Sequence, residues 1–168
     1  MPFSSPKGEK RRETTNPRFT KISVSIKCIN LAFKNPALSN PKARVQSFTV
    51  STSLPYTDPA SANYYNYTFW TAPAKCVVDS ITVRYNTASS SGTVAVHKVP
   101  SGTAPDSGTA LCTAVSTAAT ADTKYAATLS TTKSTLELAA GDALQLVDAG
   151  TLTSLADLEV TVGLHWIS

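Results

Sequence analysis

The chain has 168 residues, of which 42% are hydrophobic and only 15% are charged, and it contains ten Pro and one Met. This length is enough for one domain with its own core plus an extension, without support from disulfides or metal. No run approaches the ~20 apolar residues that a membrane helix needs, and the basic start is not followed by the apolar core of a secretory signal. We therefore expect a soluble protein with no membrane partner.

The charge divides the chain in two. Residues 1–45 carry ten Lys or Arg against two Glu, a net charge of +8, whereas residues 46–168 carry five basic and nine acidic residues, a net charge of −4. We therefore expect a basic N-terminal arm with its linker over 1–45 and a folded domain over 46–168. Such an arm can bind an acidic surface of protein, nucleic acid or lipid, or it can be a solvated leader without stable structure.

One short strand is expected within the arm. Residues 1–20 are polar and contain three prolines, so they should not fold by themselves. Ile22, Val24 and Ile26 then alternate with polar residues, which is the pattern of a strand. No tight turn links this strand to a neighbour, so it could pair with the edge of the main sheet or with a neighbouring subunit. Two Asn-Pro pairs follow and mark a linker.

From Ser47 onwards the sequence alternates between strand-like runs and turns. Leu136 and Leu138, then Leu144 and Leu146, flank the turn residues 139–142 and predict a hairpin. The fold class is all-β, an antiparallel β-sandwich or jelly roll of about eight strands with the extended basic arm in front. Outside the hairpin, strands are predicted over 47–53, 63–70, 76–85, 93–99, 109–115, 124–129 and 158–167.

The alternation also predicts which side chains face the core. We expect Val77, Ile81, Val83 and Tyr85 on one face of their strand, with Asp79 interrupting the row. Two further rows share one face of their strands: Phe48 and Val50 in 47–53, and Leu158, Val160, Val162, Leu164 and Trp166 in 158–167. In the strand over 93–99, Val94 and Val96 should point inwards. His97 should then be a solvated strand residue and not a ligand.

Residues 63–70 form the richest aromatic segment and show rings on both faces of the predicted strand. Tyr65, Tyr67 and Phe69 share one face, and Tyr64 and Trp70 lie on the other. One face can be core, so the other needs a second partner. The outer rings can lie under the N-terminal arm, or they can form a subunit contact or a ligand platform. The candidates for such a contact are Tyr64, Tyr65, Tyr67 and Trp70.

The residue types that carry out catalysis or bind metal are not grouped in a recognisable pattern. The aspartates fall mostly in turns, no GxSxG elbow is present, and His97 and His165 are not spaced as metal ligands. The three cysteines lack CxxC spacing, and Cys76 and Cys112 lie in strand-like runs, where a free Cys behaves as a small buried hydrophobe. We therefore expect no enzyme activity, no cofactor and no metal.

Four turn signals in the last hundred residues carry a resemblance. They are Ala72-Pro73, the loop Pro100-Ser101-Gly102-Thr103-Ala104, the turn Ala140-Gly141-Asp142, and Gly150-Thr151-Leu152 before the last strand. In this order they resemble a group of small β-rich bacteriophage virion proteins of the head decoration, or cement, type. The resemblance implies assembly in the host cytoplasm, a final location on the capsid surface of the virion, the major capsid protein as partner, and a homo-oligomer, often a trimer. The basic arm has no counterpart in it.

The charge of the arm suggests how such a protein would attach. Its Lys and Arg residues would set encounter rate and register on an acidic coat surface, and its apolar residues would act as anchors. A carbohydrate- or receptor-binding module of a fibre or tail, using the aromatic cluster, is the alternative. An arm that binds packaged DNA would show a steep salt dependence, and nucleic acid is not the partner that we expect. The residues of the capsid-binding arm are Lys10, Arg11, Arg12, Arg18, Phe19, Lys21, Ile22, Val24, Ile26, Lys27 and Phe33.

Overall fold

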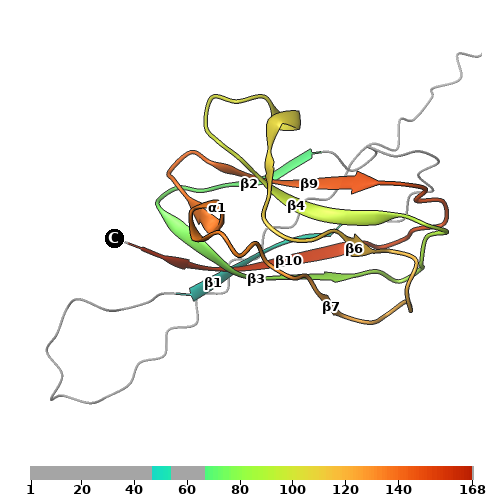
Figure 1. Cartoon of the computed structure of the whole chain (residues 1–168). Helices are drawn as coiled ribbons and strands as arrows, with labels where there is room; N and C mark the ends of the chain where they lie inside the picture. Colours follow the sequence, from blue (N-terminus) through green and yellow to red (C-terminus); the bar gives the residue numbers. More distant parts are fainter. Residues whose placement is uncertain (1–46, 54–66, 168) are drawn as a thin grey trace, which may run out of the picture.

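A computed structural model describes residues 47–53 and 67–167. In this part of the chain two antiparallel sheets of five strands each pack face to face (Figure 1). This arrangement confirms the predicted all-β sandwich. The arm and the first half of the aromatic segment lie outside the described residues.

The first sheet, which we call sheet A, holds the first and the last described strands side by side. β1 pairs with β10, β10 pairs with β3, and the far edge of β3 is shared by the two-residue strands β7 and β8. The bounds are β1 (Ser47–Ser53), β10 (Glu159–Trp166), β3 (Cys76–Arg84), β7 (Tyr125–Ala126) and β8 (Glu137–Leu138).

The second sheet, sheet B, repeats the same plan. β2 pairs with β9, β9 pairs with β4, and β5 and β6 share the far edge of β4. The bounds are β2 (Tyr67–Thr71), β9 (Ala143–Ala149), β4 (Thr93–Val99), β5 (Thr109–Ala110) and β6 (Val115–Ser116). The described helices are a short 3-10 turn, η1 (Pro105–Ser107), and a four-residue helix, α1 (Lys133–Leu136).

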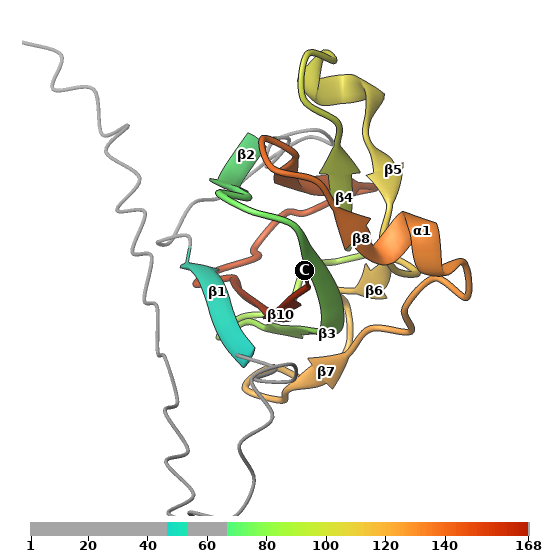
Figure 2. The same ribbon diagram turned by 90° about the vertical axis from the view of Figure 1, so that its left-hand side faces the viewer.

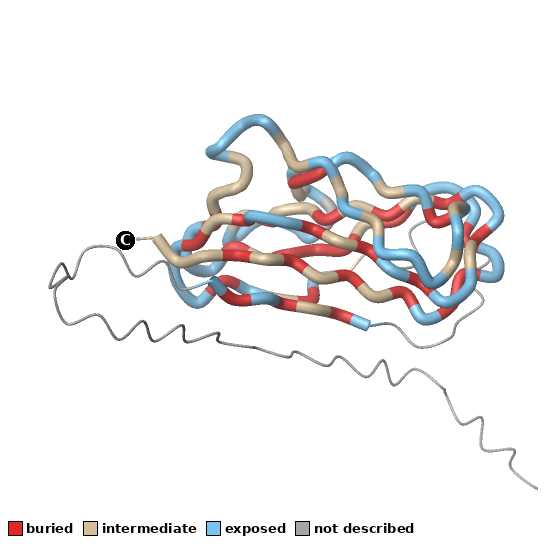
Figure 3. The backbone as a smooth tube through the Cα atoms, turned by 90° about the horizontal axis from the view of Figure 1, so that it is seen from below, coloured by how far each residue is buried: buried red, intermediate tan, exposed pale blue. Residues whose placement is uncertain are grey.

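The core lies between the sheets and follows the two-residue period of the strands. In β10 every second residue from Val160 to Leu164 is buried, and the residues between are half-buried, as the sequence predicted. Figure 3 shows this alternation along several strands. Val94 and Val96 of β4 and Phe48 and Val50 of β1 are buried in the same way, because alternate side chains of a strand leave opposite faces.

The predicted hairpin over residues 136–146 is wrong. β8 pairs with β3 in sheet A, whereas β9 pairs with β2 and β4 in sheet B, so the turn between them crosses from one sheet to the other. Leu136 belongs to α1 and not to a strand. The physical reason is that β9 is a central strand with both edges occupied, which leaves no edge for β8. Local alternation cannot show this, since it reports the faces of a strand and not its neighbours.

The prediction that Val77 lies on the inner face is also wrong. Val77 is half-buried, and its neighbours Cys76 and Val78 are buried. The register with β10 shifts here, because Gly163 pairs with Ser80 and Leu164 pairs with Val78, which leaves Asp79 as one extra residue. Such a β-bulge reverses the inside-outside phase of the strand on its two sides. Ile81, Val83 and Tyr85 lie beyond the bulge and are buried as predicted.

Residues 109–138 cross one long side of the sandwich instead of forming full strands. The predicted strands over 109–115 and 124–129 shrink to two-residue pairings, with a further bridge between Cys112 and Leu129. Leu111, which belongs to this crossing segment, is fully buried. The small residues of the segment give it little to bury as a regular strand, so it follows the edges of β3 and β4 in short steps.

Candidate interaction surface

The side of the sandwich formed by β1 and β2 carries a group of aromatic rings, which we call the aromatic rim: Phe48, Tyr67, Trp70 and Trp166. The Phe48 ring stacks on Trp166 with 4.3 Å between centroids and lies 5.8 Å from Trp70. The Tyr67 hydroxyl and Thr52 Oγ1 are 3.0 Å apart in a hydrogen bond that joins the two sheets. Figure 2 shows β1 and β2 together on this side.

The aromatic rim is only partly withdrawn from solvent. Phe48 is buried, whereas Tyr67, Trp70 and Trp166 are half-buried and pack against the core. The register between β2 and β9 shifts between Thr68 and Trp70, so the strict alternation expected for this segment is broken. The consecutive residues Phe69 and Trp70 therefore both contact the core.

The structure places only some of the predicted contact residues. Tyr67 and Trp70 belong to the aromatic rim, and Phe48 and Trp166 join them although the sequence analysis did not select either. The sequence did carry a signal for both residues. Each lies near the end of its strand, at a position that the alternation places on the inner face. Tyr64 and Tyr65 lie outside the described residues, and so do all the predicted arm residues from Lys10 to Phe33.

Asp142 joins three loops at one end of the sandwich. Its Oδ1 accepts a hydrogen bond from the Ser101 backbone N–H (3.1 Å), and its Oδ2 accepts one from Ala139 (2.9 Å). Its carbonyl accepts from the Ala72 N–H (2.7 Å), while Gly141, at φ 91°, donates to the Ala72 carbonyl (2.8 Å). Three of the four turn signals are therefore one hydrogen-bonded network, and Asp142 satisfies groups well beyond the turn in which it was predicted.

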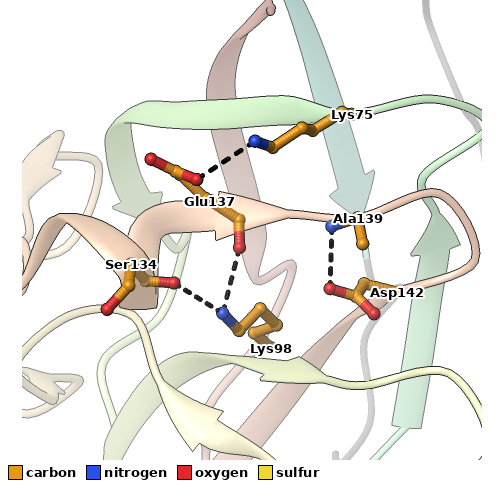
Figure 4. Close-up of polar contacts among 6 residues, drawn as sticks. All are labelled: Lys75, Lys98, Ser134, Glu137, Ala139 and Asp142. Atoms are coloured by element: carbon orange, nitrogen blue, oxygen red, sulfur yellow. Dashed lines mark hydrogen bonds and ion pairs between the residues drawn. The ribbon is translucent and has the colours of Figure 1, made fainter.

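Lys98 binds the adjacent stretch of chain at the same end (Figure 4). Its Nζ donates to the carbonyls of Ser134 (2.9 Å) and Glu137 (3.0 Å), and so links β4 of sheet B to α1 and β8 of sheet A. Glu137 also lies 3.5 Å from the ammonium group of Lys75. A lysine near a helix C-terminus meets carbonyls that lack helical partners. The sequence does not predict this role, because a single Lys in an alternating strand carries no such signal.

The fourth turn signal lies at the other end of sheet B. Gly150 has φ 78°, and an added Cβ there would approach the Ser91 carbonyl oxygen to 2.8 Å. Ser91 donates its N–H to the Thr151 carbonyl (3.3 Å), and Leu152 is fully buried. Glycine is required here by both conformation and space. All four signals thus have structural roles in holding the ends of the sandwich.

The outer face of sheet A is polar, and its one described histidine pairs with an acid. The bulge in β3 brings Asp79 next to His165, whose Nδ1 lies 2.8 Å from both carboxylate oxygens. Further along the face is a shallow hollow of about 230 Å³ lined by Thr82, Arg84, Lys124, Glu159 and Thr161. Within residues 47–53 and 67–167, no group of three or more His, Cys, Asp or Glu could hold a metal ion.

The two described cysteines are buried and free, as predicted. Burial, aided by the negative charge of Asp142, raises the pKa of Cys76 to about 11, and burial also raises the pKa of Cys112. Both therefore stay as neutral thiols at neutral pH and are poor nucleophiles, since the thiolate is the reactive form.

His97 is not the solvated residue that was predicted. It is half-buried, and an added Cβ on Gly108 would lie 3.0 Å from its Cβ, so the loop after β4 folds over it. Burial lowers the pKa of His97 below its ordinary value of 6.5. The sequence could not show this contact, because it is made by Gly108, which lies 11 residues further along the chain.

The chain was compared with known proteins. No family model matches it, and no curated protein matches it significantly. A solved chain described as "Cyanophage Pam1 capsid asymmetric unit" is similar with a TM-score of 0.47 and 14% identity, over 82% of this chain and 95% of that chain. The part of the chain that the structure describes has no helix long and apolar enough to span a membrane.

Proposed function

We propose that the chain is a structural virion protein of a bacteriophage that decorates and stabilises the capsid. In this proposal it acts as a homo-oligomer, with a trimer favoured, and its N-terminal arm binds the major capsid protein across the joints between coat subunits. The observation that carries the proposal is the division of charge, +8 over residues 1–45 and −4 over the rest. A basic extension on an acidic body favours a partner with an acidic surface that the arm reaches and the body does not.

The fold supports the proposal by supplying a rigid body. The buried hydrophobic residues of the described part form one cluster between the two sheets. The strand orders β1-β10-β3-β7 and β2-β9-β4-β5 interleave early and late strands. This is the order expected of a jelly roll, an architecture that viral capsid domains use among others. Such a body can transmit load between neighbouring coat subunits without any reactive group.

The arm would then do two separate jobs. Its basic residues, among them Arg11, Arg12 and Arg18, would steer encounter and set register on an acidic coat surface. Its apolar residues, such as Phe19 and Phe33, would add burial once the arm is in place. Because these contacts exist only in the assembled particle, they stabilise that particle by linkage.

Cosedimentation with capsids that lack the chain tests this proposal. The variant Arg11→Glu/Arg12→Glu changes the charge of the arm, and Lys124→Glu/Lys133→Glu makes the same change on the domain. We expect the arm variant to lose at least about tenfold in affinity for the capsid. Each of its two substitutions replaces a charge that an acidic coat surface attracts with one that it repels. The domain variant should bind within about twofold of the natural chain. Equal binding by both variants, or equal loss, would contradict attachment through the arm.

The alternative function is a carbohydrate- or receptor-binding module of a fibre or tail. The observation that favours it is the half-buried state of Tyr67 and Trp70, because aromatic rings with one exposed face can stack on a ligand. Trp70→Ala would abolish glycan or cell binding in this case and leave capsid binding unchanged. Under the decoration proposal, neither glycans nor host cells bind the natural chain.

A further inference from the structure

Among the described strands, β1 is a sheet edge without the usual protection. In residues 47–53 and 67–167 it pairs only with β10, through an unbroken register of seven residues from Ser47 to Ser53. It carries no charge, no Pro and no bulge. An uncharged, regular edge of this length presents a row of backbone N–H and C=O groups that readily pair with another strand.

The other three edges of the sandwich are blunted. The far edges of β3 and β4 are each divided between two strands of two residues. β2 is shorter than β1 and carries a bulge between Thr68 and Trp70. Short edge strands and bulges are the devices by which proteins prevent unwanted pairing. The described residues show these devices at three edges and not at β1. This indicates that another strand covers β1 in the functional protein.

We propose that residues 22–28 of the same chain (ISVSIKC) form the strand that covers β1. The segment is as long as β1 and has the same alternation of apolar and polar residues. Antiparallel pairing with Val24 opposite Val50 places Ile22, Val24 and Ile26 on the inner face, in line with the buried row of β1. The apolar row then extends over the aromatic rim, where Tyr67 and Trp70 are half-buried.

The length of chain between the two strands favours pairing within one molecule. Eighteen residues separate Cys28 from Ser47, and they span at most about 60 Å, which is ample for a return to the adjacent edge. A tether of this length holds the segment at an effective concentration on the order of millimolar. A second copy of the chain exceeds that concentration only in crowded assemblies.

This inference refines the proposed function and does not require it. Three of the apolar residues assigned to the capsid-binding arm, Ile22, Val24 and Ile26, would instead dock on the sheet of their own chain. The basic residues up to Lys21 would then leave the body at a fixed place, beside the end of β1 at Ser53. The coat would then be bound chiefly by residues upstream of the docked strand, such as Arg11, Arg12 and Phe19, whereas Phe33 would lie in the connection between the docked strand and β1.

A cysteine pair tests the pairing in the full chain without capsids. With Cys28→Ser as background, Ser25→Cys/Thr49→Cys places two thiols opposite each other on the outer face. Val24→Cys/Thr49→Cys is the matched control, with thiols on opposite faces. We expect the first pair to form an intramolecular disulfide at least ten times faster than the control, because its Cβ atoms meet the geometric requirement. Equal rates would overturn the pairing, and a predominantly intermolecular disulfide would overturn its assignment to one chain.

Hydrogen exchange gives a second test that requires no crosslink. In an antiparallel strand, alternate residues direct their N–H groups to opposite neighbours, so half of the β1 amides face away from β10. We expect these amides to be protected in the full chain and to exchange at least ten times faster in Val24→Asp. Ser25→Asp adds the same charge on the outer face and should leave them protected. Unprotected amides in the natural chain, or equal acceleration by both variants, would contradict the proposal.

Discussion

The two long sides of the sandwich are closed by different means. On the side of β3 and β4, residues 109–138 cross from sheet B to sheet A and cover the core with backbone, as the right-hand part of Figure 2 shows. On the side of β1 and β2, the described residues close the gap with side chains alone, through the hydrogen bond between Thr52 and Tyr67 and the contact between Phe48 and Trp70.

This difference assigns two properties to two sides of the sandwich. The side of β3 and β4 contributes more to stability, and the side of β1 and β2 offers more surface for binding. A crossing backbone satisfies its own hydrogen bonds and buries Leu111 completely, so little remains on that side for a partner. The side of β1 and β2 leaves ring surface of the aromatic rim, and it leaves the outer edge of β1 unpaired by any described strand. The first side should therefore dominate the stability of the fold, and the second should respond to a docked segment or partner.

Leu111→Ala should give the largest loss of stability. The side chain projects from the crossing segment and is fully buried, so its truncation should lower the free energy of unfolding by about 3 kcal/mol. Denaturant unfolding of both proteins measures the change.

Trp70→Ala, on the other side, is the matched comparison for this variant. It removes a larger side chain, yet that side chain is half-buried, so its loss should have the smaller effect of about 1 to 2 kcal/mol. A greater loss for Trp70→Ala than for Leu111→Ala would show that the aromatic rim, and not the crossing segment, controls stability.

Asp142→Ala should have the next largest effect. The substitution leaves the backbone N–H groups of Ser101 and Ala139 without the carboxylate that accepts from them, and the expected loss is about 2 kcal/mol. Asp142→Asn keeps one acceptor oxygen and should lose about half as much. If both variants unfold like the natural chain, the carboxylate does not hold the loops together.

The hydrogen bond between Thr52 and Tyr67 should contribute less. Tyr67→Phe removes the hydroxyl and should lower the free energy of unfolding by about 1 kcal/mol. In a double-mutant cycle with Thr52→Val, the coupling between the two sites measures how strongly this bond joins the sheets. A coupling near zero would mean that ring packing alone closes this side.

The smallest effect should come from His97. Its pKa is lowered in the folded state by burial, so below its ordinary pKa of 6.5 the unfolded chain binds the proton more tightly and stability falls with falling pH. His97→Gln should reduce the loss of stability between pH 7 and pH 5. Urea unfolding at both values checks this, and a variant with the same pH dependence as the natural chain would exclude His97 as a contributor.

The sequence predicts those parts of the fold that depend on local alternation. The inward rows of β1, β4 and β10 were expected, because a strand with one buried face must alternate. The two bulges were not, since one extra residue at Asp79 or Phe69 shows only when the partner strand is known. The neighbours of β8 also escaped prediction, because they depend on both edges of β9 being occupied.

The candidate surface was predicted in part for the same reason. Tyr67 and Trp70 were selected from a dense aromatic run, which is a local signal. Phe48 and Trp166 are isolated in the sequence and meet only because β1 and β10 are neighbours. The hydrogen bonds of Lys98 and the second role of Asp142 likewise come from contacts between distant residues, which composition and spacing do not encode.

An electron cryomicroscopy map of virions that contain the chain tests the central claim most directly. The account predicts globular density of the sandwich on the outer surface of the capsid, joined to the shell by the basic arm at the joints between coat subunits. Density for the sandwich on a tail or fibre, or on the capsid with the arm making no contact with the shell, would contradict it.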